Sequence, residues 1–295
     1  MKGPRVSLEQ WRVLQAVIDC GGFAQAAEQL HRSQSSVSYT VAKMQQQLGV
    51  TLLQIEGRKA MLTEAGKALL RQSRHLLQEA LRLEQFADDL EQGWEAEIQL
   101  VVDAAFPTSL LMQALREFEP LSHGTRVQLN EVVLSGAEDA LLQGEADLAI
   151  AAQIPSSFLA DPLIEIEFLA VAHRDHPLHK LGRGITVSDL ERELQVVIRD
   201  SGLRQQRDVG WLGAAHRWSV SSIETATTAI SEGLGFAWLP KHRIRDLLKH
   251  GVLKPIPLRD GGAYKSALYL IYGQSREPGP GTRQLAALLR KVVAD

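Results

Sequence analysis

The fold of the N-terminal part is decided by residues 21–66, which read GGFAQAAEQLHRSQSSVSYTVAKMQQQLGVTLLQIEGRKAMLTEAG. Apolar residues at helical spacing predict a short helix over 23–30 and, after a turn, a longer helix over 34–48. Ser33 is the expected N-cap of the longer helix. A helix, a tight turn and a second helix form a helix-turn-helix, whose second helix enters the major groove of DNA.

The predicted second helix has an apolar face and a polar face. Val37, Val41 and Met44 share the inward face, and the outward face carries hydroxyl, amide and basic groups. Hydrogen bonds to base edges specify sequence, whereas phosphate contacts fix the register on the duplex. We expect base-edge contacts from Gln34, Ser35, Ser38 and Tyr39, and phosphate contacts from Arg32, Lys43, Arg58 and Lys59. Any single serine could instead serve as a cap or as exposed filler.

A long helix is expected over residues 64–93, which contain no proline. Leucine recurs at every seventh position, and a small residue lies four positions after most of these leucines. Leucine at one seam position and small residues at the other allow two helices to approach closely. We therefore expect a homodimer, with the seam formed by Leu69, Leu76, Leu83 and Leu90. The alternative is a long helix that packs on its own protein.

Residues 94–295 change character, because apolar runs alternate with helical stretches. Examples of the runs are IQLVV at 98–102 and ADLAIAA at 146–152. This alternation predicts an α/β domain with a mostly parallel sheet. Its length exceeds what one small sheet needs, so we expect two subdomains with a cleft between them. Subdomain I is expected over about 94–165 and 266–295, and subdomain II over about 166–265.

The junctions between strands and helices indicate where a small molecule would bind. Ligands of open α/β sheets bind beyond the carboxyl ends of the strands, where helix N-termini offer free N–H groups. The residues expected to line such a site are Ala104, Thr108, Ser109, Ser135, Arg199, Ser201, Arg204, Ser222 and Thr225. Hydroxyl donors with an arginine nearby favour an organic anion. The alternative is that the hydroxyls only cap helices and the arginines are solvated.

Composition limits the other possibilities. The 295 residues are 45% hydrophobic and 23% charged, with a net charge of −3, as expected of a soluble globular protein. Residues 1–66 are slightly basic, with seven Lys and Arg against five Asp and Glu. The sequence contains no run of eighteen apolar residues, its first residues do not form a secretory signal, and its single cysteine suits a reducing compartment. A cytoplasmic location is therefore expected.

Motifs for catalysis and metal binding are missing from the sequence. It contains no Gly-x-Ser-x-Gly elbow, no phosphate-binding P-loop and no His-Glu-x-x-His. Histidines at 173, 176 and 179 are spaced by three, but Pro177 interrupts any helix there, and we expect a solvated loop. We expect no enzyme activity, no catalytic residues, no metal site and no cofactor other than a small-molecule effector.

With these residues considered together, the chain resembles the LysR-type transcriptional regulator family over its full length. The most specific part is residues 21–66, and GEADLAI at 144–150 and GLGFAWLP at 233–240 also resemble that family. The resemblance implies an N-terminal all-α winged helix-turn-helix over 1–63, a linker helix over 64–93 and an effector domain similar to type 2 periplasmic binding proteins. It also implies a promoter with a pseudo-palindromic site, a homotetramer and RNA polymerase as a further partner.

The sequence departs from the family pattern at several positions of the DNA-binding part. Leu53 and Ile55 stand where the family usually has Phe and Arg, and Tyr39 stands where a basic or amide residue is common. These departures leave the fold intact but change the expected half-site preference. The alternative function is a ligand-independent architectural DNA-binding protein, for which a cleft-forming α/β domain would be superfluous.

Overall fold

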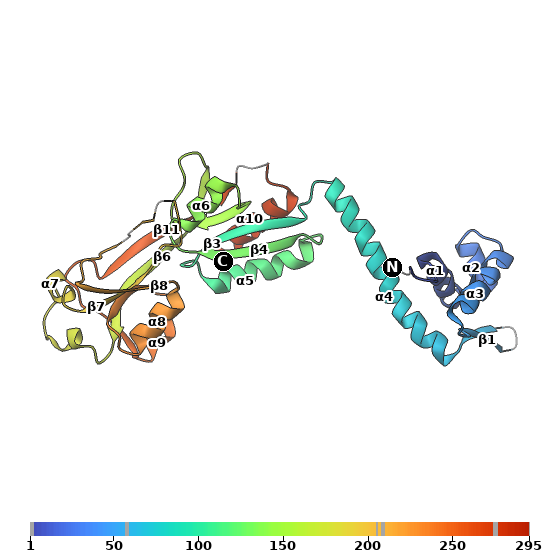
Figure 1. Ribbon diagram of the computed structural model, residues 1–295, viewed down its shortest axis with the longest axis horizontal. Helices are drawn as coiled ribbons and strands as arrows, with labels where there is room; N and C mark the ends of the chain where they lie inside the picture. The colour runs from blue at the N-terminus through green and yellow to red at the C-terminus, as the bar shows by residue number, and fades with distance from the viewer. Residues whose placement is uncertain (1–2, 57–58, 205, 208–209, 274–276, 295) are drawn as a thin grey trace. The chain divides into compact units, whose positions relative to one another are not determined.

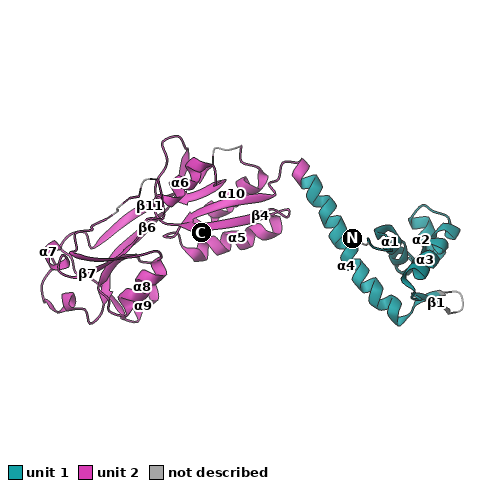
Figure 2. Ribbon diagram, in the orientation of Figure 1, with its two compact units in different colours: residues 1–89 teal, residues 90–295 magenta. Residues whose placement is uncertain are grey.

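The computed structural model describes residues 3–56, 59–204, 206–207, 210–273 and 277–294. The chain divides into two compact units, residues 1–89 and residues 90–295 (Figure 2). The boundary between the units lies near the end of a long helix, so most of the expected linker helix belongs to the N-terminal unit.

The N-terminal unit begins with three helices packed around an apolar core. They are α1 (Leu8–Asp19), α2 (Phe23–Gln29) and α3 (Gln34–Leu48). Ser33 caps α3 by accepting a hydrogen bond from the backbone N–H of Ser36, as the sequence predicts. The inward residues of α3 are buried as expected, with Val37 and Met44 0% exposed and Val41 2% exposed. The helix-turn-helix prediction is therefore confirmed.

A two-stranded wing follows α3 and leads into the long helix. β1 (Leu53–Glu56) and β2 (Lys59–Leu62) pair antiparallel, and α4 (Glu64–Glu91) follows directly. The side-chain oxygen of Gln45 accepts from the N–H groups of Leu52 and Leu53 at 2.6 and 3.1 Å, which fastens the start of the wing to α3. A Cβ at Gly66 would overlap the carbonyl oxygen of Leu52, so only glycine allows α4 to start this close to the wing.

The 28-residue helix α4 has two different halves. Near its start, Leu70 and Ser73 are buried and Leu69 is half-buried against the core of the N-terminal unit. Farther along, the leucines of the seven-residue repeat are exposed: Leu76 by 50%, Leu83 by 69% and Leu90 by 41%. Leu69, the first leucine of the predicted seam, thus packs against the core of the N-terminal unit, whereas Leu76, Leu83 and Leu90 are exposed to solvent.

The C-terminal unit is an α/β structure, shown in green to red in Figure 1. Its first lobe contains β3 (Glu97–Asp103), α5 (Thr108–Phe118), β4 (Arg126–Val132), α6 (Gly136–Gln143), β5 (Leu148–Ala151) and α10 (Pro280–Ala294). Its second lobe contains α7 (Val187–Leu190), β7 (Leu194–Ile198), β8 (His216–Val220), α8 (Ile223–Ser231), β9 (Phe236–Pro240), α9 (Arg245–Lys249) and β10 (Leu253–Pro255).

Two long antiparallel strands join the lobes. These are β6 (Ala160–His173) and β11 (Ala263–Tyr272), and they pair with each other along most of their length. The strand order within the described residues is β4-β3-β5-β11-β6-β9-β7-β8, with β10 beside β6. β3 pairs in parallel with β4 and β5, and β7 in parallel with β8 and β9. Each lobe is therefore a mostly parallel sheet, as the alternating pattern predicts.

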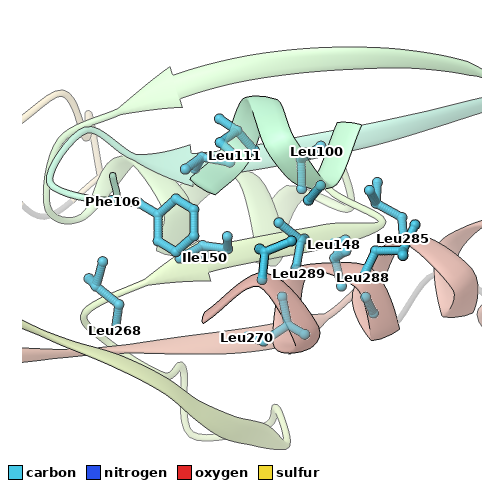
Figure 3. Packing of buried hydrophobic residues seen from close by; sticks show 14 of the residues in the cluster. Leu100, Phe106, Leu111, Leu148, Ile150, Leu268, Leu270, Leu285, Leu288 and Leu289 are labelled. Carbon is cyan, nitrogen blue, oxygen red and sulfur yellow. The ribbon is translucent and has the colours of Figure 1, made fainter. Parts of the chain in front are cut away.

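Both faces of the first lobe's sheet are covered at its inner strands β3 and β5, which are mostly buried, whereas the edge strand β4 is mostly exposed. On one face, Leu100, Leu148 and Leu270 pack against residues of α5 and α10 (Figure 3). On the other face, Val101 and Ala149 pack against α6. This packing fixes the carboxyl ends of β3 and β4, where Asp103 and Val133 line the pocket described below.

The structure corrects the expectation for the histidine-containing loop. Residues Pro177–Lys180 form a 3₁₀ turn, and His176 and Leu178 are 6% and 2% exposed, so the loop is anchored to the core at these residues while most of its other positions face solvent. Burial, together with the neighbouring His179 and His173, lowers the pKa of His176 below its ordinary value. Across the described residues, no cluster of three or more His, Cys, Asp and Glu is placed to hold a metal ion. None of the described helices is long and apolar enough to cross a lipid bilayer.

Candidate DNA-reading helix and ligand pocket

The outward face of α3 is open to solvent. Gln34 and Ser35 are exposed in its first turn, Tyr39 is 66% exposed, and Ser38 is half-buried. The hydroxyl of Ser35 lies 3.0 Å from that of the capping Ser33, so the cap and the first turn form one polar surface. These positions bring all four predicted base-reading residues onto the first two turns of one helix.

Two of the predicted phosphate contacts lie at this helix, Lys43 within it and Arg32 in the turn before it. The ammonium group of Lys43 lies 5.9 Å from the centre of the Tyr39 ring, which is within cation–π range. Arg32 forms an ion pair with Glu9 at 2.7 Å, and Glu9 also pairs with Arg12 at 2.9 Å. Arg58 and the side chain of Lys59 lie outside the described residues. An acidic partner for Arg32 means that DNA must compete with Glu9 for its guanidinium group.

Two of the predicted effector residues hold the lobes of the C-terminal unit together. Ser135 is buried, and its N–H and hydroxyl groups donate to the carboxylate of Asp200 at 3.0 and 2.7 Å. The hydroxyl of Ser201 donates to the carbonyl of Val133 and accepts from its N–H. A Cβ at Gly202 would overlap the Ser135 hydroxyl. The hydrogen bonds of Ser135 and Ser201 therefore join one lobe to the other and leave neither hydroxyl directed at a ligand cavity.

Further contacts extend this lobe-to-lobe junction. The carboxylate of Asp139 accepts from the backbone N–H groups of Leu203 and Arg204 at 2.6 and 3.1 Å. The guanidinium of Arg207 donates to Glu138 at 2.6 Å. Arg204 therefore approaches the first lobe through its backbone, while its side chain is exposed. We call the contacts between residues 133–139 and 200–207 the lobe junction.

The remaining predicted effector residues do not converge. Ser222 caps α8 by accepting from the N–H of Thr225 at 3.1 Å, and the two hydroxyls lie 2.9 Å apart. Thr108 and Ser109 are exposed at the start of α5, and Arg199 is exposed after β7. Ala104 lies beside two hollows of the surface. Eight of the nine residues are therefore divided among the lobe junction, two helix starts and the pocket wall, and Arg199 lies apart from all of these.

A pocket lies between the lobes, where the sequence predicts a cleft, but Ala104 is the one predicted effector residue among the described residues that line it. Its volume is about 110 Å³. Asp103 and Val133 contribute from the first lobe, and Gln195 and Ile198 from the second. Aromatic side chains complete the wall, namely Phe168, Trp211, Trp238 and Tyr264.

The aromatic residues give this pocket flat walls. The Phe168 and Tyr264 rings stack in parallel with their centres 4.8 Å apart, and the Trp211 and Trp238 rings lie 6.0 Å apart. The indole N–H of Trp238 donates to the carbonyl of Gly261 at 3.0 Å. Trp238 is therefore held in place by its only polar atom and offers the pocket ring surface alone.

Asp103 places a buried carboxyl in this apolar wall. Its Oδ1 accepts from the N–H of Ala105 at 2.8 Å, and the carboxylate also accepts from the backbone N–H of Leu134. Burial outweighs both hydrogen bonds and raises the pKa from 3.8 to about 6. The acidic neighbours Glu131 and Asp200 act in the same direction. Burial and Asp103 also raise the pKa of the Tyr264 hydroxyl to about 12, so that this group stays protonated.

Gln195 is the second polar group of the pocket wall, and it is 3% exposed. Its amide N–H₂ donates to the carbonyl of Trp211 at 2.7 Å, which fixes the orientation of the amide. Its Oε1 is buried and accepts no hydrogen bond from the described residues. A buried acceptor without a partner is uncommon in folded proteins and indicates a group that a ligand or water satisfies.

A second, wider hollow of about 460 Å³ lies beside α8. It is lined by Ser222, Thr228 and Arg243 among others. The guanidinium of Arg243 donates to the carbonyl of Ala104 at 3.0 Å and pairs with Glu131 at 3.3 Å. Its charge is thus already balanced by an acidic residue of the first lobe.

Comparison with known proteins identifies both units. Residues 8–67 match the model of the bacterial regulatory helix-turn-helix protein, lysR family, and residues 91–294 match the LysR substrate binding domain. The chain belongs to the LysR family. Its fold, an N-terminal helix-turn-helix followed by an α/β effector-binding domain, is the fold of LysR-type transcriptional regulators, and at the family level these are regulators and not enzymes.

Curated relatives and solved structures are similar to this chain over most of its length. The probable HTH-type transcriptional regulator YhaJ of Escherichia coli is 31% identical over 266 residues, covering 85% of this chain and 86% of that protein. A probable RuBisCO transcriptional regulator of Nostoc is 30% identical, covering 92% and 83%. The full-length regulator LysG of Corynebacterium glutamicum with bound effector Arg superposes with a TM-score of 0.54 at 19% identity, covering 98% of both chains.

In this LysR-family chain, the residues predicted to read DNA share the exposed start of α3, whereas sequence reasoning missed most of the pocket wall. The signal for Asp103 was available, because this acid directly ends an apolar strand that is buried on both faces. The aromatic residues gave no such signal, because they come from distant parts of the sequence. Trp238 of β9 and Tyr264 of β11 are brought together by the pairing of both strands with β6, and Trp211 joins them from the connection between β7 and β8.

Proposed function

We propose that this LysR-type regulator recognises a specific DNA sequence and changes its activity when a small molecule binds between the lobes of its C-terminal unit. The observation that carries the proposal is the exposed polar start of α3, with Gln34, Ser35 and Tyr39 on an otherwise well-packed helix. A glutamine in this position can make a bidentate contact with adenine, which discriminates against other bases by about 1–3 kcal/mol.

The proposed regulator acts as a homodimer. Leu76, Leu83 and Leu90 are exposed on α4 at seven-residue spacing, and such a seam is stabilised when a second helix covers it. Two recognition helices related by a twofold axis would bind a pseudo-palindromic site with half-sites about one helical turn, or a multiple of it, apart. A tetramer and a contact with RNA polymerase are further proposals that follow from the family resemblance alone.

The proposed response to a ligand is a shift between two closures of the lobes. A ligand changes such an equilibrium only through a difference in affinity for the two states. The pocket wall comes from both lobes, so opening the lobes would separate Asp103 from Gln195 and weaken binding. The lobe junction, with Ser135 bound to Asp200, supports a discrete closed state.

The expected organic anion receives no particular support from these hydroxyl groups. Ser135 and Ser201 are hydrogen-bonded across the lobes, and Ser222 caps a helix. They do not favour an anion over another class of effector.

The proposal is tested by capture of fragmented genomic DNA from the source organism on the purified full-length protein at moderate salt. Sequencing of the retained DNA should give one enriched pseudo-palindrome upstream of a few genes. Retention without an enriched site would favour the ligand-independent architectural protein, and no retention would contradict DNA recognition by α3. A matched Gln34→Ala variant controls for phosphate binding, because it should retain DNA with weaker sequence enrichment.

A further inference from the structure

The pocket between the lobes offers acceptors and aromatic surface but no positive charge. Among the described residues that line it there is no Lys, Arg or His. Its two buried side-chain acceptors are the carboxyl of Asp103 and the amide oxygen of Gln195. The Gln195 oxygen accepts no hydrogen bond from the described residues, so it can accept one from a ligand in the pocket.

The size and shape of the pocket limit its occupant. A cavity of about 110 Å³ lies between stacked and tilted rings. An apolar protein cavity of about 150 Å³ is known to take up benzene, so a volume of this order suits one ring with a small substituent. Flat aromatic walls favour a planar ring, because offset stacking of aromatic rings is favourable beyond the burial of area.

We propose that the effector is a planar, single-ring molecule that carries N–H or O–H donors and no negative charge, with its donors directed at Asp103 and Gln195. This inference rests on the proposed function only in calling the occupant an effector. An anionic ring would place a second negative charge beside Asp103 with no cation in the pocket wall to balance it, and the pocket would reject it. The protonated Tyr264 hydroxyl offers a further polar contact beside the ring.

Benzamidine and benzoate form a matched pair of probes, because each has one ring and a planar head group but their charges are opposite. Binding to the full-length protein at pH 7.5 is measured by isothermal titration calorimetry and by tryptophan fluorescence, to which Trp211 and Trp238 in the wall contribute. Benzamidine should bind at least tenfold more tightly than benzoate. Phenol, a neutral donor, should bind between the two.

Two variants assign the selectivity to the pocket. Asp103→Asn keeps the size of the side chain but removes its charge, and it should weaken benzamidine about 10- to 100-fold, the effect of a lost hydrogen bond to a charged group. In this variant the affinity for benzamidine should exceed the affinity for benzoate by less than about threefold. Asp175→Asn removes an exposed carboxylate outside the pocket and should change neither affinity. Unchanged far-UV circular dichroism verifies that both variants fold.

Each other outcome is decisive. Equal or tighter binding of benzoate, no binding of benzamidine, or benzamidine binding that Asp103→Asn leaves unchanged would overturn the inference. If genomic DNA is captured specifically while benzamidine does not bind, this inference alone fails. If benzamidine binds in the pocket but no sequence is enriched, the proposed DNA recognition fails and the pocket chemistry stands.

Discussion

Replacing Asp103 by asparagine should stabilise the C-terminal unit at neutral pH and have little effect in acid. The carboxyl of Asp103 is buried in an apolar wall and faces the acidic groups Glu131 and Asp200, with the protonated Tyr264 nearby. Its pKa is raised from 3.8 to about 6 in the folded state. The folded protein therefore binds a proton more tightly than the unfolded chain, and stability is lost as the pH rises from about 4 through 6.

The size of the effect follows from the two pKa values. A rise from 3.8 to about 6 corresponds to about 3 kcal/mol, at about 1.36 kcal/mol for each tenfold change in proton affinity. By linkage, the full cost of the Asp103 charge is present at pH 7.5, about half of it at pH 5 and about 0.5 kcal/mol at pH 4. An asparagine oxygen can keep accepting from the Ala105 N–H, but its amide nitrogen cannot accept from the Leu134 N–H. The variant therefore removes the cost of the charge and loses about 1 kcal/mol for one hydrogen bond.

Urea unfolding of the full-length protein, followed by tryptophan fluorescence, measures the difference. Four of the five tryptophans lie in the C-terminal unit, so the signal reports mainly on its unfolding. The free energy of unfolding of Asp103→Asn should exceed that of the wild type by about 2 kcal/mol at pH 7.5, and the difference should shrink steadily toward pH 4. A variant that is less stable at pH 7.5, or a gain that is the same at every pH, would refute the reasoning.

Four further substitutions test other parts of the structure. Gln34→Ala should cost about 1–3 kcal/mol at one base position of the binding site, whereas Lys43→Ala should weaken binding to all sequences and lower the log–log salt slope by about one; fluorescence anisotropy on a panel of sites separates the two. Leu83→Asp should abolish dimers without unfolding the chain, because this side chain is 69% exposed; analytical ultracentrifugation reports the mass, and a stable dimer of the variant would count against the seam. Gly202→Ala should loosen the lobe junction, because its Cβ overlaps the Ser135 hydroxyl; faster hydrogen exchange of the Ser135 amide is expected, and unchanged exchange would show that the junction does not hold the lobes.

Local signals in the sequence predicted the N-terminal unit well. Ser33 caps α3, and Val37, Val41 and Met44 form its inward face, because capping and helical spacing act over only a few residues. The same reasoning found the long helix α4 but not the difference between its halves. The burial of Leu69 depends on how α4 starts beside the wing, a contact with residues outside the repeat.

The ligand pocket could not be predicted in the same way. The hydroxyls of Ser135 and Ser201 suggested ligand contacts, but the lobes meet at these residues and use their hydrogen bonds. The pocket wall depends on the pairing of β6 with β11, strands about 100 residues apart in the sequence, which brings Phe168 against Tyr264. Such a pairing leaves no periodic signal in either strand alone, so the aromatic wall becomes visible only in the folded chain.

The specificity ratio of DNA binding tests the central claim most directly. The full-length protein is titrated against the most enriched captured site and against scrambled DNA of the same length and composition, at 150 mM salt. Sequence recognition by α3 predicts a ratio of at least about 10³ between the two affinities, as is typical of specific DNA-binding proteins. A ratio near one would contradict the account and identify a protein that binds the DNA backbone without reading its sequence.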